Sequence, residues 1–401
     1  MLALTMALGA LGIDLMLPAF DEMRSAFDLA ADSTRVAGIV TTYMLGLAVG
    51  TLLYGPMSDR TGRRPALYLG FLLYGVGALG AALAPSLSMI LVARFLWGVG
   101  AAGPRTMVLS IIRDSYSGDE MAKRMSTVFG IFILVPVFAP ALGAVIVAVA
   151  PWRWVFWVCV AYVGAIALWV MRLPETLDPA DRIESRPSDV INAVRTVLGN
   201  RQTVGYMLAL TVSFGAFVSY LASSELILSD VFDRAELFPV FFGALASVMG
   251  AAMLSNSRIV DRFGVRATVR RALFAYVAAA GALTAVAALT DGAPPLWLFS
   301  LLLAVVLTMH ALLIPNANAL AMDPMGSVAG TAASVIGFIS TGGGAGLGAI
   351  IDQSFNGTVV PLAIGFLLSA VLSLALATWA ETGRHAPRTV MPDPGSPEVL
   401  G

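Results

Sequence analysis

The chain has 401 residues, of which 58% are hydrophobic and only 12% are charged, and its mean hydropathy is +0.85. Soluble domains carry about a quarter charged residues, so this composition excludes an ordinary soluble domain and predicts a chain embedded in lipid. The formal net charge of −1 leaves no basic surplus for nucleic acid. A single cysteine, Cys159, excludes a disulfide framework and a Cys-rich metal site.

Apolar segments long enough to cross a bilayer as helices, which takes about 20 residues, recur along the chain. We expect twelve spans, at 1–20, 34–56, 66–84, 88–112, 123–149, 153–172, 203–227, 238–256, 267–290, 295–320, 327–351 and 359–380. The only long polar stretch falls between the sixth span and the seventh. The pattern predicts an all-α polytopic membrane protein.

The polar stretch also divides the chain into parts. We expect an N-terminal six-helix bundle at 1–172, a cytoplasmic linker at 173–202 and a C-terminal six-helix bundle at 203–380. The proline-rich tail at 381–401 predicts disorder.

Basic residues predict the orientation, because loops rich in Lys and Arg stay in the cytoplasm. Of the 24 basic residues, the loops on one side hold only Arg24, Arg35, Arg153 and Arg234. Two more lie within spans, and the rest fall on the side that holds both chain ends. Both termini are therefore expected in the cytoplasm.

A short motif occurs once in each half. The loop after the second span reads Asp59-Arg60-Thr61-Gly62-Arg63-Arg64, and the loop after the eighth reads Asp261-Arg262-Phe263-Gly264-Val265-Arg266. Two six-helix halves related by an internal repeat are the plan of many secondary transporters.

Several motifs resemble those of one family. The segment from Gly55 to Pro65 resembles the loop 2–3 signature of the major facilitator superfamily. Asp14-Leu15-Met16-Leu17-Pro18-Ala19 resembles the D-x-x-x-P-A element of twelve-helix drug:proton antiporters, in particular the Bcr/CflA branch. Arg94 to Gly98 is similar to the superfamily's R-x-x-Q-G element, with Trp97 where many relatives carry Gln. Gly130, Pro136, Pro140 and Gly143 resemble the antiporter motif of helix 5 in a degraded form.

The resemblance implies the major facilitator fold, with two six-helix bundles related by a pseudo-two-fold axis. It implies a drug:proton antiporter of the bacterial inner membrane that exports small amphipathic drugs, such as amphenicols, by alternating access. The proton gradient is then the energy source, and neither a cofactor nor a metal is expected. The expected partners are drugs, protons and the lipid bilayer, and the protein is expected to be a monomer.

Residues of these motifs are the candidates for conformational change. The loop cluster is expected to latch the two bundles on the cytoplasmic side, unless it is only a charged turn. The expected gating residues are Gly55, Asp59, Arg60, Gly62, Arg63, Arg64, Gly130, Pro136, Pro140 and Gly143.

Ionisable residues inside spans cost at least ~2.5–3.5 kcal/mol on insertion scales, so each is a functional candidate. Those found are Asp14, Arg94, Arg105, Glu225 and His310. A carboxyl that holds either a proton or a cationic drug couples the two, and Asp14 is the first choice for this role. Glu225 takes the corresponding place in the repeat, and Arg94 is the expected partner of a titrating acid. The alternatives are a helix cap for Asp14, a fixed ion pair for Arg94 and an interface role for Glu225.

Arg94 and Arg105 are eleven residues apart, so they lie within roughly 20° on one helix face and are expected to line one wall of a cavity. Aromatic residues suit an adaptable drug pocket, although most in such helices face lipid. The candidate substrate-binding residues are Tyr43, Trp97, Arg105, Phe132, His310 and Asn316. For His310, a hydrogen-bonded place inside the bundle is the stronger interpretation.

One alternative keeps the fold and changes the cargo to a metabolite, such as a sugar or an amino acid. An enzyme is disfavoured because the chain has only two histidines and no nucleotide loop, metal motif or Ser/His/acid set. A receptor is disfavoured because no sizeable soluble domain accompanies the helices.

Overall fold

Helices account for nearly all of the regular structure, as lipid requires, because every backbone polar group in the bilayer must be bonded internally. The computed structural model describes residues 1–116, 118–178, 180, 182 and 187–382, and this part of the chain contains no strand. Nearly all of the tail predicted to be disordered, from residue 383 on, lies outside the described residues.

The first half comprises α1 (Leu2–Asp14), η1 (Leu17–Ala19), α2 (Phe20–Ala26), η2 (Thr34–Ala37), α3 (Gly38–Thr61), α4 (Arg63–Leu83), α5 (Leu87–Ser115), α6 (Gly118–Val149) and α7 (Trp154–Val170). The linker contains α8 (Pro187–Gly199). The second half comprises α9 (Arg201–Leu226), η4 (Ile227–Val231), η5 (Ala235–Leu237), α10 (Phe238–Phe263), α11 (Val265–Leu289), α12 (Leu296–Met322), η6 (Asp323–Val328), α13 (Ala329–Gln353) and α14 (Val360–Glu381).

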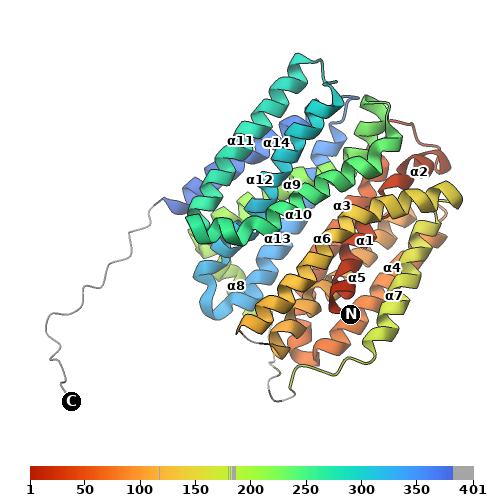
Figure 1. Ribbon diagram of the computed structural model, residues 1–401. Coiled ribbons are helices and arrows are strands. Elements are labelled where there is room, and N and C mark those ends of the chain that lie inside the picture. The colour runs from red at the N-terminus through yellow and green to blue at the C-terminus, as the bar shows by residue number, and fades with distance from the viewer. Residues whose placement is uncertain (117, 179, 181, 183–186, 383–401) are drawn as a thin grey trace.

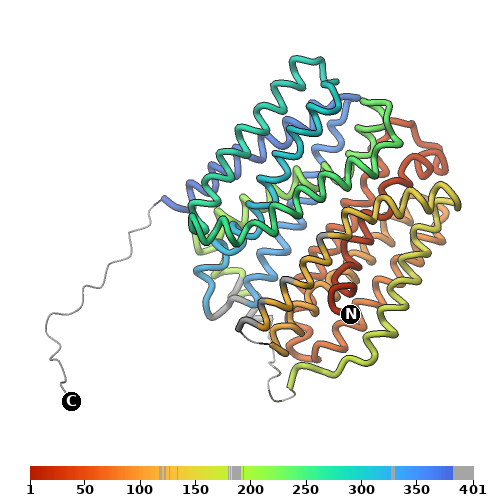
Figure 2. Tube along the Cα trace, viewed as in Figure 1, coloured from red at the N-terminus to blue at the C-terminus, as the bar shows by residue number. Residues whose placement is uncertain are grey.

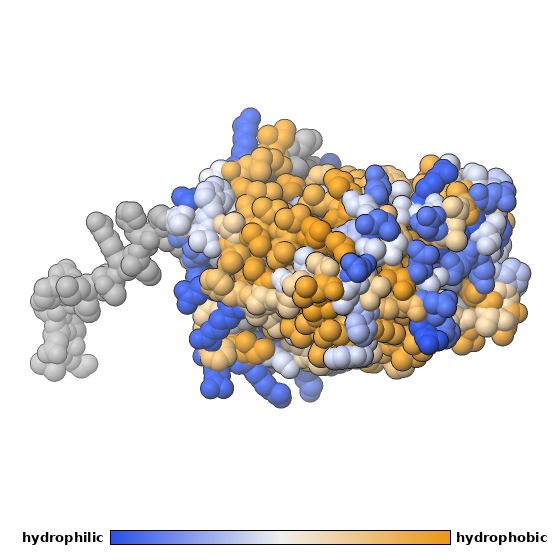
Figure 3. All heavy atoms as spheres, turned by 90° about the horizontal axis from the view of Figure 1, so that it is seen from above, coloured by the Kyte–Doolittle hydropathy of each residue, from blue (hydrophilic) through white to orange (hydrophobic). Residues whose placement is uncertain are grey.

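Among the described residues, eleven helices are long and apolar enough to cross a membrane, and α7, with 17 residues, is a shorter apolar twelfth. The predicted fold class, an all-α polytopic membrane protein, is confirmed. Figure 3 shows apolar residues gathered over the middle of the molecule and hydrophilic ones toward its ends. Leu72, Leu168 and Val240 are more than half exposed, at 61%, 69% and 72%. Such side chains on the outside of a membrane protein face lipid.

The helices form two groups, α1–α7 and α9–α14, that meet along their length (Figure 1). The Cα trace in Figure 2 shows the gold α6 running beside the green α10. A Cβ on Gly243 of α10 would lie 3.0 Å from the carbonyl oxygen of Val137 in α6, and one on Gly55 of α3 would lie 2.9 Å from Ser334 Oγ in α13. Glycine therefore lets helices of the two groups approach closely.

The internal repeat is visible in the backbone. Gly62 lies between α3 and α4 with φ +101°, and Gly264 lies between α10 and α11 with φ +76°. Glycine adopts these left-handed conformations without the strain that a Cβ would bring. The two D-R-x-G-x-R segments thus make the same kind of helix-to-helix turn.

The first span is longer than predicted and is broken. The segment Leu17–Ala19, which contains Pro18, is a 3-10 turn between α1 and α2, and helical structure continues to Ala26 instead of stopping at residue 20. Proline lacks the N–H that an α-helix interior needs, which explains the break. As a result, Arg24, predicted to lie in an outer loop, is in a helix and only 3% exposed.

Candidate functional site

Asp14, the last residue of α1, is an isolated acid. It is 4% exposed, and its carboxyl group has no hydrogen bond or ion pair with any described residue. The turn η1, which follows Asp14, contacts α9 of the other half. An unpaired carboxyl buried between two halves of a membrane protein is costly, which marks it as functional.

Arg94 of α5 is held by backbone groups rather than by an acid. Its Nη1 donates to the carbonyl oxygen of Gly12 at 2.8 Å, and its Nε donates to that of Ile39 at 3.2 Å. The guanidinium carbon lies 4.2 Å from the ring centroid of Tyr43 and 4.6 Å from that of Trp97. Arg94 is fully buried, and Nη2 has no hydrogen-bond partner. Among the described residues it makes no ion pair with a carboxylate.

The aromatic candidates near Arg94 are packed around α1. A Cβ on Gly12 would lie 3.1 Å from Tyr43 Oη, 3.2 Å from Tyr74 Oη and 3.4 Å from Trp97 Nε1. Tyr43 also donates to the carbonyl oxygen of Gly9 at 2.9 Å. Tyr43 and Trp97 are both 0% exposed, so here they hold α1 against α3 and α5 rather than lining an open pocket.

Helix α6 packs on the break in the first span. A Cβ on Gly143 would lie only 2.1 Å from the carbonyl oxygen of Leu15 and 3.3 Å from Pro18 Cδ. Pro140, one turn earlier, is buried, and Pro136 is half-buried. A Cβ on Gly130, in contrast, would meet nothing within 4 Å. Of the two glycines, only Gly143 is required by a close helix contact.

Glu225, near the end of α9, forms an ion pair between the halves. Its Oε2 accepts from Arg24 Nη2 at 2.8 Å, and Arg24 Nη1 lies 2.5 Å from Asp21 Oδ1. Glu225 and Arg24 are 4% and 3% exposed. Of the ion pairs between described residues, only this one joins the two halves. Glu225 is therefore an interface residue in this conformation.

The charged cluster around the first D-R-x-G-x-R loop is confined to the first half and the start of the linker. Arg63 donates to Asp59 Oδ1 at 2.6 Å and to Asp114 Oδ2 at 2.7 Å. The backbone N–H groups of Arg63 and Arg64 donate to the Glu175 carboxylate at 2.8 and 3.0 Å. Partial burial acts to raise the pKa of Glu175, but these and two further backbone N–H bonds outweigh it and hold the pKa below its usual value.

No ion pair of this cluster reaches the second half within the described residues, although a latch between the bundles was expected. Gly55 of the motif approaches the other half, at Ser334. Arg60 is exposed. The cluster instead joins α3, α4 and α5 to the residues after α7.

The remaining candidates for substrate binding are dispersed. Arg105 of α5 is exposed and has no ion pair with a described residue, whereas Arg94 is fully buried. Phe132 of α6 packs against a small apolar cluster near the start of the chain. His310 Nδ1 lies 2.8 Å from Ser213 Oγ, and its ring stacks on Phe217 at 4.9 Å.

Asn316 donates to Asn256 Oδ1 at 2.6 Å and to the carbonyl oxygen of Leu312 at 2.7 Å. Its amide is therefore engaged within the second half, as is the ring of His310. Neither residue is brought together with Asp14 by a contact among the described residues.

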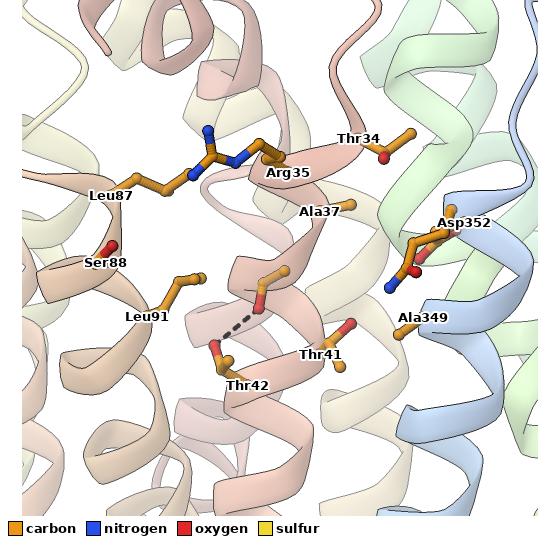
Figure 4. A pocket seen from close by; sticks show the side chains of 12 residues that line it. Thr34, Arg35, Ala37, Thr41, Thr42, Leu87, Ser88, Leu91, Ala349 and Asp352 are labelled. Carbon is orange, nitrogen blue, oxygen red and sulfur yellow. Dashed lines mark hydrogen bonds between the residues drawn. The ribbon is translucent and has the colours of Figure 1, made fainter. Parts of the chain in front are cut away.

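Sequence reasoning missed Asp352. This residue of α13 is 4% exposed, accepts from Ser219 Oγ at 2.7 Å through Oδ1, and lines a cavity of about 360 Å³ between the halves (Figure 4). The predicted span ended at residue 351, so Asp352 was counted with the loop. Counting ionisable residues within about one turn of each span end would have found both Asp352 and Arg24.

Known proteins resemble most of the chain. A model of the Major Facilitator Superfamily matches residues 2–349. The uncharacterized MFS-type transporter YdgK of Bacillus subtilis is 30% identical over 94% of this chain and 93% of its own length. A bicyclomycin resistance protein homolog of Haemophilus influenzae is 29% identical over 93% of both chains. The human organic anion transporter MFSD10 superposes with a TM-score of 0.73 at 18% identity, covering 95% of this chain and 98% of that one.

Proposed function

This chain belongs to the Major Facilitator Superfamily, as its loop motif predicted, and we propose that it exports small amphipathic drugs in exchange for protons. It is a multi-pass membrane protein of a transporter family and not of an enzyme family. The name of the Haemophilus influenzae relative supports drug export. We include amphenicols and bicyclomycin among the candidate cargoes, and the proton gradient is the proposed energy source.

The proposed location is the inner membrane of a bacterium, with both termini in the cytoplasm, because that orientation keeps most Lys and Arg residues inside. In this orientation the pair Arg24–Glu225 lies at the outer side and the cluster around Arg63 lies at the cytoplasmic side. A monomer is proposed as the working unit.

Asp14 carries the proposal, because its carboxyl is buried between the halves and has no partner among the described residues. In an apolar site a carboxyl either binds a proton or needs a compensating charge. A drug that enters beside Asp14 and favours the charged form releases the proton, and rebinding of a proton expels the drug. One site then serves both cargoes in turn.

The structure around Asp14 offers a way to pass this change to the helices. Arg94 bonds the carbonyl oxygen of Gly12, two residues before Asp14, and also that of Ile39 in α3. Gly143 of α6 rests against Leu15, the residue after Asp14. A shift of this turn moves α3, α5 and α6 together. The outer side then opens when the ion pair between Arg24 and Glu225 breaks.

The test uses inverted membrane vesicles with an imposed pH gradient and a pH-sensitive dye. Chloramphenicol, bicyclomycin or ethidium is added to vesicles containing the wild type, Asp14→Asn or the control Asp28→Asn. Asp28 is exposed and has φ +52°, a conformation that Asn tolerates. We expect at least one drug to dissipate the gradient through the wild type and the control, but not through Asp14→Asn.

Two results would contradict the proposal. Equal responses from Asp14→Asn and the wild type would remove Asp14 from coupling. No response to any drug, together with proton-linked movement of labelled sugars or amino acids, would make the protein a metabolite transporter.

A further inference from the structure

A cavity that none of the motifs predicted lies between the two halves. Its volume is about 360 Å³, within the range of small-molecule sites. One wall comes from η2 and the first turns of α3 and α5, and the other comes from the last turns of α13, including Asp352. Figure 4 shows Thr41 of α3 and Ala349 of α13 on opposite walls. A ligand in this cavity would contact both halves.

The carboxyl of Asp352 is only half satisfied. Its Oδ1 accepts from Ser219 Oγ of α9 at 2.7 Å, whereas its Oδ2 is buried and has no hydrogen-bond partner. Burying a carboxylate oxygen without a partner costs free energy. Because χ2 of an aspartate is broad, a small turn of the carboxylate can aim Oδ2 at a donor in the cavity while Oδ1 stays bonded to Ser219. If Asp352 had only a structural role, we would expect both of its carboxylate oxygens to accept hydrogen bonds.

Other polar groups of the cavity are also available. The hydroxyls of Thr41 and Ser88 line it and have no hydrogen-bond partner among the described residues. Arg35, the other charged residue of the lining, has no ion pair with a described residue. Figure 4 shows its side chain directed toward Leu87, away from Asp352. Arg35 therefore supplies no compensating charge to Asp352.

We propose that this cavity binds solutes that carry a protonated amine, with Asp352 as the counter-charge. The ammonium group donates to Asp352 Oδ2 and to the Thr41 hydroxyl, while Ser219 keeps the carboxyl in place through Oδ1. The remainder of the solute lies between Leu91 and Ala349, the apolar part of the walls. That such amines are exported cargo rests on the proposed export function. The inference adds amines to the drugs that the protein is proposed to carry.

The site differs from the one around Asp14. Asp14 lies on α1, in the first half, whereas Asp352 lies on α13 in the second half and faces η2 and α3. In the proposed orientation the Asp352 cavity is near the outer surface, at the same side as Arg35. It is placed to hold an amine on its way out.

The test measures binding of dansylcadaverine, a fluorescent primary amine, to the purified full chain in lipid nanodiscs. Its N-acetyl derivative keeps the shape and loses the charge. We expect Asp352→Asn to weaken dansylcadaverine binding by about tenfold or more and to leave binding of the acetylated probe unchanged. Glu236→Gln, which removes an exposed negative charge elsewhere at this side, is the matched control and should bind both probes as the wild type does.

A second variant keeps the test informative if Asp352→Asn does not fold. Thr41→Val leaves α13 untouched and is expected to weaken amine binding several-fold. The inference is overturned if Asp352→Asn binds dansylcadaverine as the wild type does, if the acetylated probe binds the wild type equally well, or if a folded Thr41→Val is unaffected while Asp352→Asn fails to fold.

The binding measurement needs no pH gradient, so it separates this inference from the proposed function. If no drug dissipates the gradient but amine binding depends on Asp352, then export fails and the site stands. If chloramphenicol still exchanges for protons in Asp352→Asn and amine binding is insensitive to the substitution, then export stands and the site fails.

Discussion

The two copies of the D-R-x-G-x-R loop share a backbone turn and differ in how firmly it is held. In the first half, Arg63 is 4% exposed and bonds Asp59 and Asp114 at 2.6 and 2.7 Å. In the second half, Val265 takes the place of Arg63, and Arg266 is 44% exposed with contacts of 3.1 and 3.3 Å to Asp323 and Glu381. Both copies of the loop therefore have the same turn, whereas among the described residues only the first copy has buried ion pairs.

Removing the buried arginine should separate the two loops most clearly in their contribution to the free energy of unfolding. We expect Arg63→Gln to destabilise the protein by about 2 kcal/mol, because it leaves Asp59 and Asp114 without their charged donor. Arg266→Gln, at the exposed copy, should cost less than about 1 kcal/mol. Thermal unfolding in the same detergent measures both. Equal losses would show that the two loops are held alike.

The helix contacts beside the loops extend the comparison. Gly143→Ala should cost about 1–3 kcal/mol, since a Cβ there overlaps the carbonyl oxygen of Leu15. Gly130→Ala, in the same helix, meets nothing and is the control. Gly348 in α13 has a looser contact, 2.9 Å to the carbonyl oxygen of Gly215, and should respond less than Gly143. Unfolding midpoints and drug export rates measure the losses at Gly143, Gly348 and Gly130. A larger loss at Gly348 than at Gly143 would contradict the expected order.

The ion pair between the halves tests whether they are joined at the outer end. A double-mutant cycle with Arg24→Gln and Glu225→Gln should give a coupling of about 1 kcal/mol in thermal stability, since both side chains are buried and 2.8 Å apart. The control cycle uses the exposed pair Arg124 and Glu120 within α6, which should give at most about 0.5 kcal/mol. Coupling no larger at Arg24–Glu225 than at the control would mean that this pair does not hold the halves together.

A small effect is expected at Glu175, which follows the sixth span and caps the start of α4. Glu175 binds the backbone N–H groups of Arg63 and Arg64, so Glu175→Gln should cost about 1 kcal/mol at neutral pH. Because folding lowers the pKa of Glu175, its contribution is complete above the unfolded value of about 4.3 and is lost as the pH falls through the lower folded value. The protection factor of the amides in the first turn of α4, which corrects for the intrinsic pH dependence of exchange, should therefore be constant down to about pH 5 and fall below pH 4. Glu381→Gln should not affect that turn, and a loss of protection already between pH 5 and 7 would be inconsistent with this assignment.

Much of the fold could be predicted from the sequence, because apolar length and charged breaks determine the spans directly. Most predicted ends fall within a few residues of the helices. There are exceptions. The sequence placed Pro18 in a motif, but it did not predict that the helix breaks at Pro18 and then continues to Ala26. The helix α8 inside the polar linker was not predicted.

The site was less predictable, because periodicity gives the face of a helix but not its neighbour. Tyr43 and Trp97 were expected to line a pocket, and they pack around Gly12 instead. Arg94 was expected to meet an acid, and it bonds carbonyl oxygens of two other helices. Asp352 was missed by a single residue at a span end. Its role depends on a cavity made by segments about three hundred residues apart, which no local pattern encodes.

The central claim is that a drug and a proton exchange at Asp14, and proton release on drug binding tests it most directly. The purified chain is mixed with drug in a weakly buffered solution containing a pH indicator, without any gradient. We expect the wild type and Asp28→Asn to release protons as the drug binds, whereas Asp14→Asn should bind the drug and release none. Equal proton release from Asp14→Asn and the wild type would contradict it.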